Sequence, residues 1–139
     1  MEKILNRILV PVDGSKTSHI AIEYASKLAK SSDANIHLLH VIDGIGHWQT
    51  EGQNEDSLRK ERANYILEEA ENITKRYHVP VTKSIAKGSV PEKIVDFAKE
   101  NGIDLIVMGT RGMSGYNNPM LGHVSEKVAR NAHCPVVLV

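Results

Sequence analysis

The sequence predicts a three-layer α/β/α protein, in which a parallel five-stranded sheet lies between helices. Short apolar runs rich in β-branched residues alternate along the chain with longer amphipathic stretches. Strands that alternate with helices form parallel sheets, because right-handed crossovers return the chain to the same edge with helices on both faces. We therefore expect the order βαβαβαβαβ within a single domain, residues 1–139.

Five apolar runs are read as strands. The first is followed by Asp-Gly-Ser, which is a turn signal. The third contains a proline, which places it near a sheet edge. The expected strands are residues 7–12, 34–42, 79–86, 103–108 and 134–139.

Four helices are expected between these strands. Ser15 caps the first, a helix is expected from Ser57 to Tyr77, and Ser89 with Pro91 begins the third, which runs to about Glu100. The apolar positions that recur at helical spacing are, in the first, second and fourth helices respectively, Ile20, Ala21, Tyr24, Ala25 and Leu28; Leu58, Ile66, Ala70 and Ile73; and Leu121, Val124, Val128 and Ala129.

Composition excludes several classes of function. The formal net charge is zero, which argues against a nucleic-acid binder that depends on bulk positive charge. No apolar stretch approaches the roughly 20 residues of a membrane span. A single cysteine, Cys134, cannot form an internal disulfide and fits a reducing compartment. We therefore expect a soluble cytoplasmic protein that binds neither nucleic acid nor membrane.

Two loops hold the candidate binding residues. Parallel sheets bind ligands at the carboxyl ends of strands, where the strand order reverses. Asp13 directly follows the first strand, and a glycine-rich loop that begins at Gly109 follows the fourth. Glycines let backbone N–H groups approach an anion, the helix that follows adds its positive dipole end, and Arg111 adds a charge. Two purely structural alternatives stay open: the glycines form a tight turn, and Asp13 is a turn or helix-cap residue.

The glycine loop resembles a known nucleotide-binding pattern. Gly109, two residues, Gly112, nine residues and Gly122 are similar to G-x-x-G-x9-G-(S/T) of the universal stress protein family. The opening "ILVPVDGS" and the closing "GHVSEKVARNAHCPVVLV" resemble that family's first strand and its last helix and strand. The resemblance implies a sheet in the order 3-2-1-4-5, similar to the adenine-nucleotide alpha hydrolase fold, and a stress-response protein that binds ATP.

The resemblance also implies a set of binding residues. The set is Pro11, Val12, Asp13, Val41, Gly109, Arg111, Gly112, Gly115, Gly122, His123, Val124 and Ser125. The first three would line the adenosine pocket, with Asp13 near the ribose or a Mg²⁺ bound with the nucleotide, and the backbone of Val41 would contact the adenine edge. The next four would surround the phosphates, and the last four would close the site at the start of the helix. His123 departs from the pattern, because ATP-binding members carry Ser or Thr there; Ser125 offers a hydroxyl two residues later.

Three functions are compatible with these residues. A nucleotide-binding regulatory module is preferred over a slow ATPase or phosphoryl transferase, because no residue stands out as a base and there is no phosphate-loop lysine. We therefore assign no catalytic residue. A dimeric interaction protein that binds no nucleotide is the third possibility, and it rests on His123.

The last strand bears on assembly, and the histidines bear on metal binding. The last strand carries neither charge nor bulge, so we expect a homodimer in which two copies of residues 136–138 pair. Seven histidines invite a metal interpretation, but His37 and His40 fall on opposite faces of a strand and no spacing resembles a zinc site.

Overall fold

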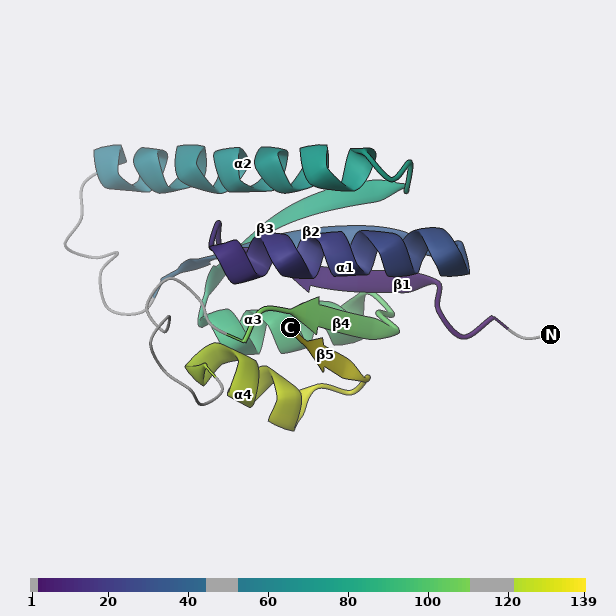
Figure 1. Cartoon of the computed structure of the whole chain (residues 1–139). Coiled ribbons are helices and arrows are strands. Elements are labelled where there is room, and N and C mark those ends of the chain that lie inside the picture. The colour runs from purple at the N-terminus through teal and green to yellow at the C-terminus, as the bar shows by residue number, and fades with distance from the viewer. Residues whose placement is uncertain (1–2, 45–52, 111–121) are drawn as a thin grey trace.

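Five parallel strands form one sheet in the order β3-β2-β1-β4-β5, as predicted. The computed structural model describes residues 3–44, 53–110 and 122–139. Helices α1 and α2 pack on one face and α3 and α4 on the other, which gives the three layers (Figure 1). The strands are β1 Arg7–Pro11, β2 Asn35–Asp43, β3 Val81–Gly88, β4 Leu105–Met108 and β5 Val136–Leu138. The helices are α1 Lys16–Ser32, α2 Gln53–Lys75, α3 Val90–Glu100 and α4 His123–Asn131.

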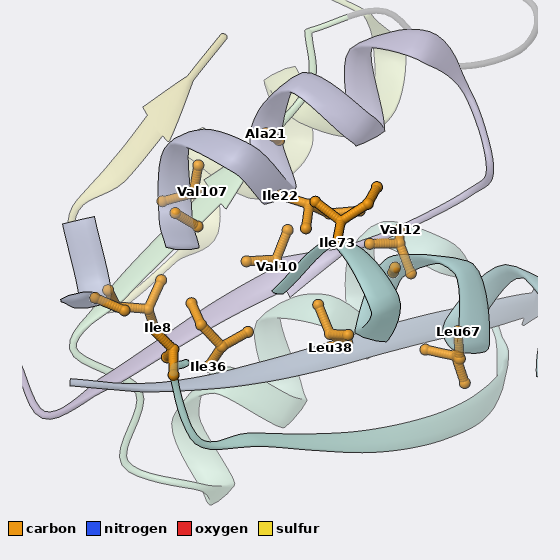
Figure 2. Close-up of a cluster of buried hydrophobic side chains, with 14 of the residues drawn as sticks. Ile8, Val10, Val12, Ala21, Ile22, Ile36, Leu38, Leu67, Ile73 and Val107 are labelled. Atoms are coloured by element: carbon orange, nitrogen blue, oxygen red, sulfur yellow. The ribbon is translucent and has the colours of Figure 1, made fainter. Parts of the chain in front are cut away.

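The two faces of the sheet bury two separate apolar clusters. Successive side chains of a strand point to opposite faces, so Ile8 and Val10 enter the cluster under α1 and α2, while Leu9 enters the cluster under α3 and α4. Figure 2 shows the first cluster, in which the β1 and β2 side chains meet Ile22 of α1 and Ile73 of α2. Burial on both faces explains why the central strands are continuous apolar runs.

The helix faces differ in part from those expected. In α1 the buried side chains include Ala21, Ile22 and Ala25, whereas Ile20 and Tyr24 are 53% and 46% exposed. The buried face contains small residues, so α1 lies close to both the sheet and α2. In α2, Leu58 is also exposed, although it was expected on the apolar side.

The start of α2 and the buried face of α4 also differ from the expectation. Helix α2 begins at Gln53, four residues before the expected Ser57. The expected start was too late because the first turn is polar and shows no apolar period. In α4 the small side chain of Ser125 takes the buried position beside Val128, and Ala129 is exposed.

The two edges of the sheet are built differently. On β3, Lys83 pairs with Glu71 and Lys87 pairs with Asp56, and such lysines block the addition of another strand. This agrees with the predicted edge position. The outer edge of β5 lacks such residues, because its three positions are Val, Val and Leu.

A membrane-spanning segment is not found in the described part of the chain, where no helix combines the required length and hydropathy.

Candidate functional site

The ends of β1 and β4 lie side by side, as predicted. Ile8 pairs with Leu105 and Leu9 with Ile106, so both strands run in the same direction and end at the same edge of the sheet. The turn that follows β1 and the loop that follows β4 therefore begin next to each other. β1 also pairs with β2 on its other side, so the strand order reverses at this point.

The turn after β1 holds Asp13 by several contacts. Ser15 N donates to Asp13 Oδ1 at 2.9 Å, and Asp13 N donates to Ser18 Oγ at 3.3 Å. Gly14 adopts a left-handed φ of 84°, and a Cβ there would lie 3.3 Å from Ile66 Cγ1 of α2. Elements α1 and α2 therefore fix the turn, and one carboxylate oxygen of Asp13 accepts a bond within it.

Ser15 acts as the predicted cap of α1. Its Oγ accepts a hydrogen bond from Ser18 N at 3.2 Å, and its own backbone is extended. The capping function and the ligand function expected for this turn are compatible, because the cap uses the Ser15 hydroxyl and the bond within the turn uses only Oδ1 of Asp13.

The residues of β2 that border the site are Leu39, His40 and Val41. Val12 N donates to Leu39 O at 2.8 Å, and His40 Nδ1 lies 2.7 Å from Val12 O. The side chain of Val41 is buried, 8% exposed, on the α3 and α4 side. Sequence reasoning did not find His40, because periodicity places its side chain on a face but does not reveal a bond to a neighbouring turn.

Gly109 is needed where β4 passes under the first turn of α1. A Cβ at this position would lie 2.7 Å from Thr17 Oγ1 and 3.0 Å from the Thr17 carbonyl carbon. The Thr17 backbone cannot move without moving helix α1, so a side chain at position 109 would separate α1 from the sheet. The sequence suggested phosphate approach or a tight turn for this glycine, and its packing against Thr17 was missed.

Gly122 is needed where the chain enters α4. Its N–H donates to Thr110 O at 2.7 Å, and a Cβ there would lie 2.3 Å from the same oxygen. The glycine therefore lets Thr110 and the first residue before α4 touch. This contact joins the two ends of the glycine-rich loop.

The start of α4 carries three further candidates. His123 is exposed at the first helical position and Val124 is half-buried. Ser125 is 2% exposed, and its Oγ lies 3.0 Å from Gly122 O and 3.3 Å from Thr110 O. A hydroxyl has one proton, so the Ser125 proton is used by these carbonyl groups. His123 is thus the exposed polar side chain at this helix start.

Three predicted phosphate residues lie outside the described part of the chain, namely Arg111, Gly112 and Gly115. Their part in binding stays a prediction from the sequence.

The histidines of β2 form no metal site. His37 contacts Ser84 Oγ at 2.9 Å and the Phe97 ring of α3, and burial lowers the pKa of His37 below its usual value. His40 bonds to the turn after β1 instead. Among the described residues, no group of three or more His, Cys, Asp and Glu side chains is arranged to hold a metal ion.

The chain belongs to the universal stress protein family, whose model matches residues 5–139. A universal stress protein of Methanocaldococcus jannaschii is 34% identical over 146 aligned residues, which cover 99% of this chain and 84% of the relative. The Bacillus subtilis universal stress protein YxiE is 37% identical over 98% of this chain and 99% of its own length. A solved universal stress protein in complex with cAMP superposes with a TM-score of 0.78 at 25% identity, over 96% of both chains.

We predict that Gly122→Ala destabilises the protein with or without nucleotide. Its Cβ would collide with Thr110 O, and overpacking of this kind costs about 1–3 kcal/mol. Urea denaturation of the nucleotide-free protein measures this loss. Lys127→Ala, on the exposed side of α4, is the control and should change stability by less than about 0.5 kcal/mol. A Gly122→Ala protein as stable as the wild type would contradict the packing role.

Proposed function

We propose that this chain is a cytoplasmic stress-response protein that binds an adenine nucleotide as a regulatory module. The observation that carries the proposal is the turn of Asp13, held at the edge where β1 and β4 end together. Ligands of parallel α/β sheets bind at this place, where the strand order reverses. The cAMP complex of a similar universal stress protein supports an adenine nucleotide as the ligand.

The proposed site has an adenosine side and a phosphate side. The adenosine side comprises Pro11, Val12 and Asp13, at and just after the end of β1, and Val41, two residues before the end of β2. On the phosphate side, Gly109 and the start of α4 flank the loop that contains the sequence-predicted phosphate residues. The physiological ligand we propose is ATP, with Mg²⁺ near the second carboxylate oxygen of Asp13. We assign no catalytic residue.

Asp13→Asn tests the adenosine side with little change in shape. The amide oxygen can still accept from Ser15 N, so the turn should persist, but the negative charge is lost. A hydrogen bond to a charged group is worth roughly 1.5–3 kcal/mol, so affinity should fall about tenfold or more. Calorimetry with ATP and Mg²⁺, and with AMP, measures the loss.

The control for Asp13→Asn is Asp33→Asn. Asp33 ends α1 at the opposite edge of the sheet in a left-handed conformation that asparagine accepts. The affinity of the Asp33→Asn protein for ATP and for AMP should equal that of the wild type. If the wild type binds neither ATP nor AMP, the proposed function is wrong.

His123 is predicted to donate an N–H to the phosphates. It is the exposed side chain at the start of α4, and the Ser125 proton is used by carbonyl groups. His123→Ala should bind ATP several-fold more weakly and adenosine as well as the wild type does. His123→Ser, which restores a donor, should lie close to the wild type for ATP. Tighter ATP binding by both variants would instead make the imidazole a steric block.

We also propose that two copies pair through β5. Val139 N donates to Met108 O and Val139 O accepts from Thr110 N, so both backbone groups of Val139 face β4. Backbone groups of a parallel strand alternate in direction, so Val137 also faces β4, whereas those of Val136 and Leu138 face the open edge. An apolar edge with free donors and acceptors favours the addition of a second strand.

Val136→Pro should convert a dimer into a monomer. It removes an N–H that faces the open edge, whereas the Val139 N–H that pairs with Met108 O of β4 is retained. Light scattering at micromolar concentration reports the mass. The matched variant is Val137→Pro, which removes a donor to β4 and should lower the melting temperature. A monomeric wild type would rule out the proposed dimer.

A further inference from the structure

The peptide group between Val12 and Asp13 is held from both sides by side chains. Its carbonyl oxygen lies 2.7 Å from His40 Nδ1 of β2. Its N–H donates to Ser18 Oγ of α1 at 3.3 Å. This is the peptide that directly precedes the Asp13 side chain, so its orientation sets the direction in which the carboxylate leaves the backbone.

The hydrogen bond fixes the proton on the His40 ring. A carbonyl oxygen only accepts, so Nδ1 must be the nitrogen that carries a proton. The ring is half-buried in β2, directly before Val41 and three residues before the strand ends at Asp43. His40 is therefore a donor aimed at the turn, and its ring cannot leave that position without exposing an unpaired carbonyl group on Val12.

The fold itself does not need this bond. Val12 is anchored by its N–H bond to Leu39 O at 2.8 Å and by a side chain that is 4% exposed in the first apolar cluster. Those contacts hold Val12 at the end of the strand. They leave the rotation of the following peptide undetermined, and His40 and Ser18 determine it.

We propose that His40 is a positioning residue of the nucleotide site, which presents the Asp13 carboxylate to the ligand in one orientation. The inference rests on the proposed function, because it concerns how that same site is ordered before the ligand arrives. A site that is ordered in advance loses less conformational freedom on binding. His40 acts through the turn and need not touch the nucleotide.

Two substitutions at position 40 separate a positioning role from a packing role. His40→Phe keeps a ring of similar size but has no donor. His40→Asn is smaller, but its amide N–H₂ can replace the Nδ1 donor. In calorimetry with AMP, His40→Phe should bind about tenfold more weakly, which corresponds to about 1.4 kcal/mol, and His40→Asn should bind within threefold of the wild type. A packing role predicts the reverse order.

His37→Phe is the matched control on the same strand. Its ring lies on the other face, against Phe97 of α3, and has no contact with the turn. AMP affinity should equal that of the wild type. A loss as large as that of His40→Phe would mean that any ring exchange on β2 weakens binding, and this would overturn the inference.

The exchange rate of the Asp13 amide proton gives a readout that needs no ligand. With His40→Phe the Val12–Asp13 peptide should rotate more freely, so this amide should exchange at least tenfold faster while Leu39 and Leu9 amides keep their rates. An unchanged Asp13 rate would overturn the positioning role.

The outcomes distinguish the inference from the proposed function. If the wild type binds AMP or ATP and His40→Phe binds equally well, the positioning role is wrong and the nucleotide site stands. If the wild type binds no adenine nucleotide, the proposed function fails and this inference fails with it. If His40→Phe does not fold, Ser18→Ala decides, because it frees the other side of the same peptide and should weaken AMP binding.

Discussion

The pairing of β1 with both β2 and β4 is the constraint on which the rest of the structure depends. β1 is buried on both faces, and its two neighbours run parallel to it. All three strands must therefore end at the same edge. The chain leaves β1 toward α1 on one face, and α3 precedes β4 on the other face, so the connections diverge at this point. The strand order alone therefore brings the turn after β1 and the loop after β4 together, whichever side chains they carry.

Close backbone contacts then decide which residues occupy that edge. Gly109 lets the first turn of α1 approach β4, and Gly122 lets Thr110 touch the entry to α4. Both contacts are made between protein atoms alone, so packing requires these glycines whether or not a phosphate binds. A glycine motif of this kind combines two constraints, and sequence alone cannot separate them because both are met by the absence of a Cβ.

Much of the fold could be predicted from the sequence, because strands buried on both faces appear as apolar runs and helices as amphipathic stretches. The order of the strands came from the resemblance, and the structure confirms it. The exposure of Ile20 and Tyr24 could not be predicted, since they lie next to the buried Ala21 and Ala25 and an apolar period does not show how far around the helix burial extends. The bond of His40 to Val12, and the engagement of Ser125 with Thr110 O, link residues far apart in sequence, so no local pattern reports them.

The two sides of the proposed site differ in how they are held. The turn of Asp13 is fixed by β2 through His40, by α1 through Ser18 and by α2 through the contact of Gly14 with Ile66. Three elements thus determine one short turn, and a carboxylate held in this way is ordered before a ligand arrives. On the phosphate side, the junction of Thr110 with Gly122 fixes where the loop begins and ends. In the proposed site, both sides are therefore anchored by contacts between protein atoms at the ends of β1 and β4.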